Sequence, residues 1–572
     1  MPMNLRLLTL IAAPLLTAGC ATLPAVAPPA AQAYPAGMVS AADPRAAEAG
    51  AAMLRQGGSA TDAAIATMLA LTVVEPQSSG IGGGGFYVAS NARGEVETID
   101  GRETAPAAAH PQWFVKDGVQ LRYGDVVPGG TSAGVPGNIA LAAKAHRAHG
   151  RLPWAALFEP AIKFAKDGFE VTPRLHEMML EDLGVIGFTP EGRALYLGGD
   201  GKPHPAGTVI RNPALAATLE AVATQGAAAF YQGANARAIV AKVTTAPRNP
   251  APMVENDVAA YQAKSREPVC ATYRLHRICS MGPPSSGATT VLATLLQLER
   301  FDMKKLGKDS PVAWHLIAES ERLAYADRAR YLADADFVAV PVAGLIDSAY
   351  IAQRSALMSE SGTIAKAAAG VPPGADKLAW GDAEPAVEHG TSHFVAIDRA
   401  GNAVSYTSTI ESSFGSGLLV GGYWLNNELT DFDLKPEAEG RLVANRPDAG
   451  KRPRSSMSPT LVFGPDGKLR LAVGAAGGWT IPAQVLRSII GVVDWDLSAQ
   501  DSVALPVILA FGDAIYVERG TPLEAMAAAL KALGHADVKV GPPMFKANAI
   551  EVRDGRLWGA ADPRSEGKAV GE

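Results

Sequence analysis

Hydrophobic positions recur with helical spacing through most of the first half of the chain. Ala-rich segments that open near Ser, Asp or Pro and close near Gly predict helices. They occupy residues 43–58, 59–76, 133–150, 153–168 and 310–332. A Gly/Pro/Ser loop leads into another helical pattern within 282–299, so we expect one shared core rather than two halves joined by a linker.

Alternating apolar runs on either side of polar, Gly-containing turns predict antiparallel hairpins. One falls at 84–103, and three follow residue 390, at 393–410, 460–474 and 547–563. Helices and hairpins occur without strict strand–helix–strand alternation, which favours an α+β layered sandwich over a doubly wound parallel sheet. The weakest pattern is the Pro/Gly-rich segment 363–390, which ends just before Thr391.

Composition excludes several classes of protein. Hydrophobic residues make up 48% of the 572 positions and charged residues 19%, so a sizeable core is expected. The formal net charge is −6, and no long run of Lys or Arg occurs. The sequence therefore predicts neither a nucleic-acid partner nor attraction to an anionic membrane surface.

The first 20 residues have the pattern of an export signal. Arg6 precedes an apolar run, and small residues precede Cys20, as in a bacterial lipoprotein cleavage site, although Thr17 stands where Leu is more usual. We expect export to the periplasm. After cleavage of the signal, Cys20 is the expected site of lipid attachment. Residues 21–38 are an Ala/Pro-rich tether. No later segment has the length of apolar sequence that a transmembrane helix needs.

The other two cysteines flank a short hairpin pattern. If its turn centres on Arg274 and Leu275, Cys270 and Cys279 face each other across the two strands. An oxidising compartment would allow a disulfide between them; two free buried thiols are the alternative. No Cys/His spacing indicates zinc, and we expect neither a metal nor a cofactor.

Motifs of the common hydrolases do not occur. The sequence has no G-x-S-x-G elbow and no H-E-x-x-H, and the glycines at 80–85 lack the Lys of a phosphate loop. A threonine hydroxyl needs a base beside it to act as a nucleophile. An N-terminal threonine can use its own α-amine, which Thr391 would have only after cleavage of the Gly390–Thr391 bond.

Many separate motifs, in one order, resemble the gamma-glutamyltranspeptidase family of self-cleaving N-terminal-nucleophile hydrolases. The resemblance covers nearly everything after about residue 35. It implies a four-layer αββα sandwich, built as one structural domain from two self-cleaved subunits. The motifs are "VEPQSSGIGGGGF", "DGRETAP", "GVPG", "MGPPSSG", "EHGTSHF", "TSTIESSFGSG", "LNNELTDF", "KRPRSSMSPT", "GAAGG" and "GAADPRSEGKAVG".

The resemblance implies the catalytic residues. Thr391 would be the nucleophile and the first residue of the small subunit, and the hydroxyl of Thr409 would lie next to it. The backbone N–H groups of Gly477 and Gly478 would form an oxyanion hole, since glycine lets a backbone approach closely. The subunits would then be residues 39–390 and 391–572.

The resemblance also implies how a gamma-glutamyl donor is held. Arg102 would bind the α-carboxylate with its planar fork, together with the hydroxyls of Ser455 and Ser456. Glu428 and Asp431 would bind the α-ammonium. Asn426, Asn427, His389 and His393 are interpreted as structural.

Two departures from the family pattern bear on specificity. Glu411 stands where the family usually has Asn, which adds a third carboxylate near one ammonium and predicts that one carboxyl holds a proton or seeks a second cation. The span 433–454 is shorter than in members with a lid over the site and contains no aromatic residue. A more open cover favours hydrolysis over transfer to an amine.

The sequence thus predicts an exported gamma-glutamyltransferase or hydrolase that acts on glutathione-like donors, with water or an amine as acceptor. Two alternatives remain. One is an acylase for another dicarboxylic acyl amide, of the glutaryl-cephalosporin type, which Glu411 keeps open. The other is a non-catalytic exported binding lipoprotein that keeps the pocket but not the chemistry.

Overall fold

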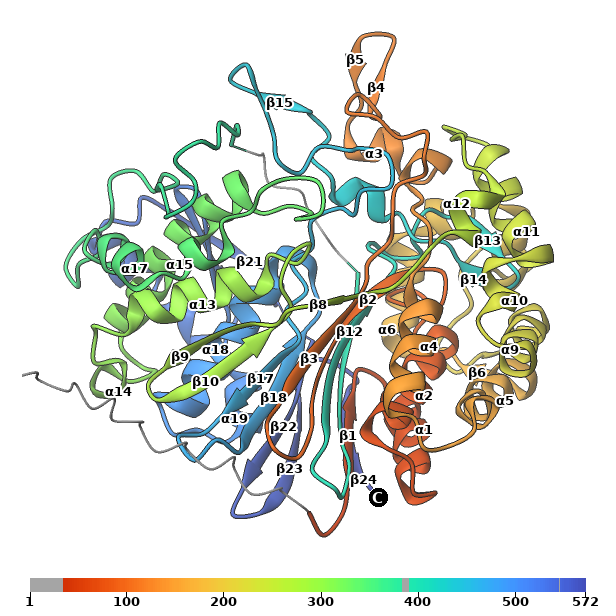
Figure 1. Cartoon of the computed structure of the whole chain (residues 1–572), viewed down its shortest axis with the longest axis horizontal. Helices are drawn as coiled ribbons and strands as arrows, with labels where there is room; N and C mark the ends of the chain where they lie inside the picture. Colours follow the sequence, from red (N-terminus) through yellow and green to blue (C-terminus); the bar gives the residue numbers. More distant parts are fainter. Residues whose placement is uncertain (1–33, 383–389, 545) are drawn as a thin grey trace, which may run out of the picture.

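The computed structural model describes residues 34–382, 390–544 and 546–572. Two β-sheets lie face to face at the centre, and helices cover the outer face of each (Figure 1). The molecule is thus the four-layer α+β sandwich expected from the sequence. The export signal, Cys20 and His389 lie outside the described residues.

The first sheet has seven strands. Its order is β24 (Lys568–Gly571), β1 (Met38–Ala41), β11 (Ser392–Ile397), β12 (Ala403–Thr409), β2 (Gly84–Ser90), β3 (Val96–Gly101) and β8 (Lys264–Arg266). The predicted hairpins at 84–103 and 393–410 are the antiparallel pairs β2–β3 and β11–β12.

The second sheet has six strands, all paired antiparallel. Its order is β23 (Arg556–Ala561), β22 (Ala547–Arg553), β18 (Leu469–Ala475), β17 (Thr460–Phe463), β10 (His276–Ser280) and β9 (Val269–Tyr273). The other two predicted hairpins are β17–β18 and β22–β23.

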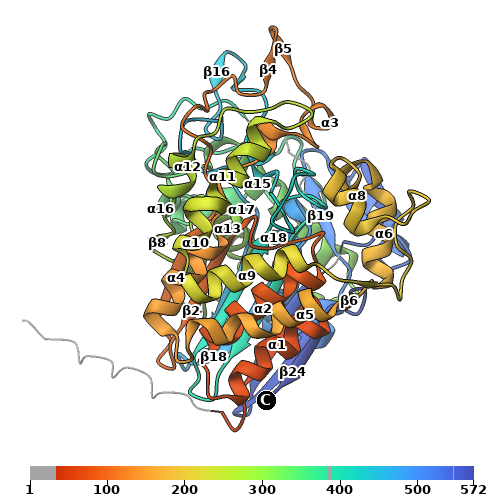
Figure 2. The same ribbon diagram turned by 90° about the vertical axis from the view of Figure 1, so that its right-hand side faces the viewer.

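One helical layer covers the first sheet, and Figure 2 shows it from outside. It includes α1 (Pro44–Arg55), α2 (Ala60–Val74), α4 (Asn138–His149), α5 (Glu159–Asp167) and α9 (Pro213–Gln225). Every residue of α2 is buried, which fits a helix that is apolar on all sides. It begins at a capping box in which the Asp62 N–H donates to Ser59 Oγ and the Ser59 N–H donates to the Asp62 carboxylate.

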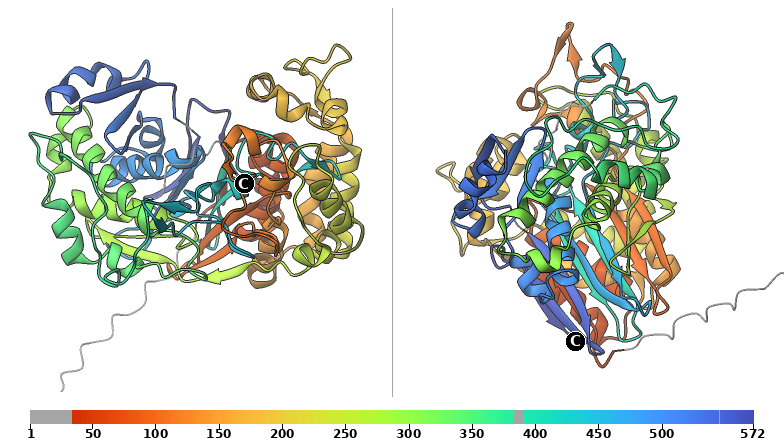
Figure 3. Two further views of the ribbon diagram at one scale, coloured as in Figure 1. Left: turned by 90° about the horizontal axis from the view of Figure 1, so that it is seen from above. Right: turned by 90° about the vertical axis from the view of Figure 1, so that its left-hand side faces the viewer.

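The other helical layer covers the second sheet and is seen from two sides in Figure 3. It includes α13 (Gly287–Leu298), α15 (Pro311–Tyr331), α18 (Ile481–Val493) and α19 (Ala499–Ala504). A small sheet of β19 (Ile508–Phe511), β20 (Ala514–Glu518) and β21 (Asp537–Gly541) lies beside it. The helix α21 (Ala527–Ala532) packs against β21 and α15. No helix in the described parts of the chain is both long enough and apolar enough to cross a bilayer.

Two small hairpins project from the top of Figure 1. They are β4 (Val115–Lys116) with β5 (Val119–Gln120), and β15 (Glu437–Ala438) with β16 (Arg441–Leu442). The second hairpin lies within the short span 433–454. Residues 363–382 and 390, the described part of the weakly patterned segment, contain no helix and no strand.

The cysteine hairpin has the predicted geometry. Arg274 and Leu275 form the turn with φ of +47° and +68°, and Cys270 lies directly opposite Cys279. A disulfide joins them across β9 and β10.

The described end of the Ala/Pro-rich tether is ordered against the first sheet. The buried Tyr34 donates its N–H to the Arg399 carbonyl over 2.9 Å, and Met38 opens β1. The last residues of the Ala/Pro-rich tether thus pack against the first sheet.

Candidate active site

The site residues come together because several strands start or end at the same edge of the sandwich. Thr391 precedes β11 and Thr409 closes β12, and Ser392 lies opposite Ser408 in the pairing of these strands. Arg102 follows the end of β3, and Gly477 follows the end of β18. Strand pairing within the first sheet, together with the packing of the two sheets on each other, thus brings residues more than 300 positions apart to one place.

The hydroxyl of Thr391 donates to the hydroxyl oxygen of Thr409 over 3.0 Å. Thr409 Oγ1 also accepts the N–H of Glu411 over 2.8 Å. Both threonines are buried. Thr409 is therefore fixed by its own chain and fixes in turn the orientation of the Thr391 hydroxyl.

The backbone at Thr391 is strained. Its φ is +114°, a region that β-branched residues avoid and that costs on the order of 1–3 kcal/mol. The Thr391 N–H donates to the Ser78 carbonyl over 3.0 Å, and the Thr391 carbonyl accepts from Lys546 Nζ over 3.0 Å. On the other side of the peptide bond, a Cβ on Gly390 would meet the Glu411 carbonyl oxygen at 2.0 Å, so only glycine fits there.

The two glycines after β18 present backbone N–H groups. Gly477 and Gly478 have φ of +114° and +58°. Within residues 34–382, 390–544 and 546–572, no protein acceptor takes a hydrogen bond from either N–H. The loop is held by Thr480 Oγ1, which donates to the Gly477 carbonyl over 2.8 Å, and by Gln484 Nε2, which donates to the Ala476 carbonyl over 2.6 Å.

Arg102 is fully buried among acceptors. One guanidinium nitrogen contacts Glu428 and another contacts Asp431. The backbone carbonyls of Pro453 and Arg454 also accept from it, over 3.1 Å and 3.0 Å. The fork is thus locked in one orientation.

Carboxyl groups crowd around this guanidinium. Burial raises the pKa of Glu103 to about 7, although Arg102 opposes the shift. Burial also raises the pKa of Glu428 well above its usual range; Arg102 opposes this shift, and the charges of Glu103 and Glu411 add to it. Burial and the mutual repulsion of these carboxyls thus both favour protonation within the cluster.

Two side chains hold the carboxylate of Glu411. Its Oε2 accepts from the Tyr123 hydroxyl over 3.1 Å and from the side-chain amide of Asn427. Its backbone has φ of +73°. Asn426, by contrast, uses its side chain on the backbone of Gly82, Gly134 and Glu428, as expected of a structural residue.

The two adjacent serines differ in position. Ser455 lies in the pocket and its Oγ accepts the Met457 N–H over 3.1 Å. The Oγ of Ser456 accepts from Arg328 over 2.6 Å instead. The structure thus brings Ser455, but not the hydroxyl of Ser456, to the small pocket that Arg102 and Thr391 share. That pocket is lined by Arg102, Thr391, Thr409, Glu411, Glu428, Asp431, Ser455, Met457 and Ile481.

A larger cavity of about 740 Å³ lies between the two projecting hairpins. Tyr123 and Thr430 line it, and they adjoin Glu411 and Asp431 of the small pocket. The cavity is well placed to receive the part of a substrate that extends away from Thr391.

Among the residues around the site that sequence reasoning missed, four hold its parts in place. Tyr123 anchors Glu411, Ser78 and Lys546 bond the backbone of Thr391, and Glu75 pairs with Lys546. None lies next to Thr391 in sequence, so no local pattern could have identified them. Only Ser78 and Glu75 fall within a motif that carried the family resemblance.

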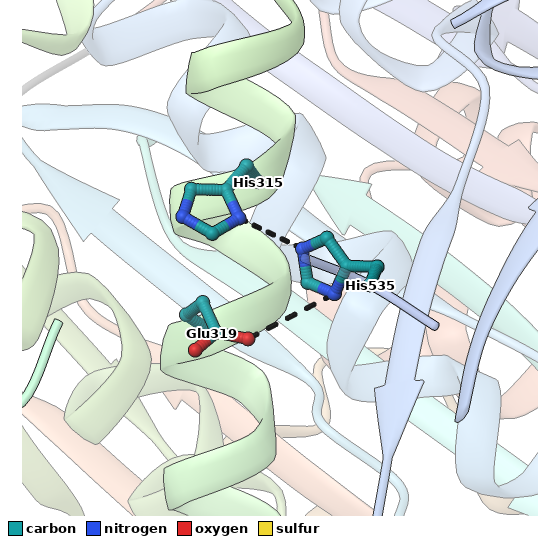
Figure 4. Close-up of side chains that lie close together, drawn as sticks. All are labelled: His315, Glu319 and His535. Atoms are coloured by element: carbon teal, nitrogen blue, oxygen red, sulfur yellow. Dashed lines mark hydrogen bonds and ion pairs between the residues drawn. The ribbon is translucent and has the colours of Figure 1, made fainter. Parts of the chain in front are cut away.

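A separate cluster of metal-ligand types lies on the far side of the second sheet (Figure 4). His315 Nδ1 lies 2.8 Å from His535 Nε2, and His535 Nδ1 lies 3.9 Å from Glu319. One possible ligand atom from each of the three buried side chains lies within 4.8 Å of the others. Arg322 also donates to Glu319 over 2.7 Å, so this carboxylate is already paired with a cation.

The fold and the pocket together define a hydrolase of the N-terminal-nucleophile class, with an internal threonine at the start of a central strand. The chain belongs to the gamma-glutamyltranspeptidase family, whose model matches residues 46–572.

Relatives cover nearly the whole chain. It is 35% identical over 543 residues to the glutathione hydrolase proenzyme of Escherichia coli, covering 92% of this chain and 90% of that protein. It is also 35% identical over 543 residues to the Acylase ACY 1 proenzyme of Pseudomonas sp. (strain SE83), covering 93% of each. A solved cephalosporin acylase from Bacillus halodurans matches with a TM-score of 0.80 and 25% identity, over 97% of this chain and 99% of that one.

Proposed function

We propose that this enzyme processes itself at Gly390–Thr391 and then cleaves gamma-glutamyl amides through an ester on Thr391. The observation that carries the proposal is the Thr391 hydroxyl, bonded to Thr409 and placed in one pocket with Arg102. A proposed nucleophile and an arginine able to bind a carboxylate therefore line the same small pocket.

Self-cleavage would create the base. Thr391 Oγ1 attacks the Gly390 carbonyl carbon, the C–N bond breaks, and the nitrogen takes up the hydroxyl proton. Water then hydrolyses the resulting ester, which leaves a carboxylate on Gly390 and an α-amine on Thr391. Strain at the φ of +114° favours this step, since the cut removes the constraint on the Thr391 backbone.

Turnover would use the same hydroxyl. The α-amine accepts the hydroxyl proton while Oγ1 attacks the donor's side-chain carbonyl, and Thr409 holds the hydroxyl in line. The N–H groups of Gly477 and Gly478 stabilise the oxyanion; losing one such donor costs about 3 kcal/mol of barrier in comparable enzymes. The amine then protonates the leaving nitrogen, and water or an amine attacks the ester.

The donor's charged end would meet residues that are already in place. Arg102 bonds Glu428 and Asp431 before any donor arrives. The donor's α-carboxylate would form an ion pair with the guanidinium and accept a hydrogen bond from the Ser455 hydroxyl. Its α-ammonium would pair with the carboxylates of Glu428 and Asp431. Such preorganisation keeps the cost of binding low.

We infer that water is the preferred acceptor. The short span 433–454 forms the β15–β16 hairpin, whose residues 437–442 are exposed or half-buried. A cover of this kind leaves the ester open to solvent.

The second candidate is an acylase for a dicarboxylic acyl amide that lacks the α-ammonium. The similarity to the Pseudomonas and Bacillus acylases supports it. Comparing kcat/KM for gamma-glutamyl and glutaryl anilides separates the two: a glutaryl preference would replace the main proposal.

We also propose that the protein is exported to the periplasm by its first 20 residues and anchored by a lipid on Cys20. The pattern of Arg6, the apolar run and Cys20 supports this, as does the Cys270–Cys279 disulfide, which suits an oxidising compartment. Mass spectrometry of the N-terminal peptide from membrane and periplasmic fractions tests both points, with Cys20→Ala as the control.

Intact mass and N-terminal sequencing of the purified enzyme test the central proposal, beside Thr391→Ala. We expect two fragments, the smaller beginning Thr-Ser-His-Phe, and an uncut, inactive Thr391→Ala chain. An uncut wild-type chain without activity would indicate a binding protein instead.

A further inference from the structure

Lys546 is a buried lysine that the reaction as described does not use. It lies just before β22, with 3% of its surface exposed. Its Nζ donates to the Thr391 carbonyl over 3.0 Å and to Ser78 Oγ over 3.0 Å, and it forms an ion pair with Glu75. The Lys546 backbone has φ of +119°, which a lysine adopts only where its surroundings impose it.

The same residue contacts the glycine loop. The Lys546 carbonyl accepts the Ala476 N–H over 3.1 Å, immediately before Gly477. Lys546 therefore bonds the nucleophile's backbone through its side chain and the oxyanion loop through its main chain.

Its charge lies close to the atom that would act as the base. The nitrogen and the carbonyl oxygen of Thr391 are separated by three covalent bonds, so a cation on that oxygen also lies near the nitrogen. The Thr391 nitrogen itself is held by the Ser78 carbonyl. A nearby positive charge disfavours protonation of an amine and lowers its pKa.

Other charged groups around this position must be weighed. Glu75 pairs with Lys546 and its second oxygen accepts from the Ser392 hydroxyl, one residue beyond Thr391. Of this pair, Lys546 is the member that bonds the Thr391 backbone directly, over 3.0 Å. Further charged groups on the surrounding elements include Arg174, Glu566, Glu411, Arg102, Glu103, Glu428 and Asp431.

We propose that Lys546 is a positioning residue with two effects. It keeps the α-amine of Thr391 neutral at working pH, and it fixes the position of Thr391 relative to the Gly477–Gly478 loop. This inference rests on the proposed function, because it assigns a role toward the amine that self-cleavage releases. An unprotonated amine is the form that can accept the Thr391 hydroxyl proton.

The test is the pH dependence of kcat/KM for Lys546→Met and Lys546→Arg, measured with gamma-glutamyl-p-nitroanilide. Each protein is first checked by intact mass for complete cleavage before Thr391. We expect the acid limb to move about one pH unit upward in Lys546→Met, which is about a tenfold loss of rate on that limb. Lys546→Arg, which keeps the cation, should stay close to the wild type.

Two further variants sharpen the result. Lys539→Met removes an exposed lysine on β21 and should leave the profile unchanged. The double variant Lys546→Met/Glu75→Gln removes both charges of the pair. If the Lys546 charge dominates, the double variant keeps part of the upward shift.

Two outcomes would overturn the inference. One is a fully cleaved Lys546→Met enzyme with the wild-type acid limb, which would leave the proposed function intact. The other is a double variant that returns to the wild-type profile, because the shift would then come from an unpaired Glu75. Failure of the proposed function is separate: it would appear as turnover by Thr391→Ala.

Discussion

The hydroxyl of Thr391 donates to the hydroxyl of Thr409, whose oxygen is itself held by the N–H of Glu411. The nucleophile is therefore aligned by a hydroxyl from the neighbouring strand, which is in turn fixed by its own chain two residues further on. Alignment of this kind depends on a single acceptor atom, so it can be removed without changing the fold.

We expect Thr409→Ala to slow both self-cleavage and turnover, because the Thr391 hydroxyl loses its fixed partner. A hydrogen bond of this type is worth roughly 1–3 kcal/mol, or about tenfold to hundredfold in rate. Thr409→Ser keeps the hydroxyl and should recover most of the rate. Cleavage is followed by gel and turnover by anilide release. Equal rates for Thr409→Ala and Thr409→Ser would contradict this role.

Glu411→Gln should change the choice of acyl donor. The substitution removes one negative charge from the pocket but keeps acceptors for Tyr123 and Asn427. Attraction for a donor ammonium falls, so kcat/KM for gamma-glutamyl anilide should drop about tenfold relative to that for glutaryl anilide. Tyr123→Phe, which keeps the carboxylate, serves as the matched control. An unchanged ratio would show that Glu411 does not act on the donor.

Stability should fall in mild acid because of His535. Burial lowers the pKa of His535 to about 4, with the nearby His315 and Arg322 contributing. The unfolded chain binds this proton near pH 6.5 and the folded chain does not, so stability is lost as pH falls from about 6.5 through 4. His535→Asn should flatten that part of the curve of unfolding midpoint against pH. His110, exposed on the surface, provides the control as His110→Asn. Identical slopes for both variants would refute the assignment.

Gly474→Ala tests the packing between the two sheets beneath the site. A Cβ at Gly474 would meet the His393 ring at 2.3 Å, and the ring is buried with no room to move away. We expect a loss of about 1–3 kcal/mol in unfolding free energy, as for other overpacked cores. Gly541→Ala, where no atom lies within 4 Å of the added carbon, should leave stability almost unchanged. Chemical denaturation of the cleaved enzyme measures both.

The sequence predicted those features that depend on local pattern. Alternation around Gly-containing turns identified the β2–β3, β11–β12, β17–β18 and β22–β23 hairpins, and cap residues placed the ends of α1 and α2. The assignment of Thr391 as the nucleophile came from the family resemblance and stays a prediction, and the structure places its hydroxyl beside that of Thr409.

Other features depended on contacts that no local pattern records. Ser78 and Lys546 are 468 positions apart, and the packing of the second sheet against the first brings Lys546 to Ser78 and Thr391. Ser455 and Ser456 were grouped as one feature, but successive residues of an extended chain point in opposite directions, so only Ser455 reaches the pocket. Asn427 was interpreted as structural, yet its amide anchors Glu411.

The strand order of the first sheet has a consequence for the mature enzyme. β1 lies between β24 and β11, so a strand from before Gly390 is hydrogen-bonded on both sides to strands from after it. β12, from the second piece, pairs with β2 of the first. Strands from the two pieces therefore alternate within one sheet, and separating the pieces would require breaking the hydrogen bonds of that sheet. Their association should therefore persist at any dilution at which the protein stays folded, with dissociation as slow as global unfolding.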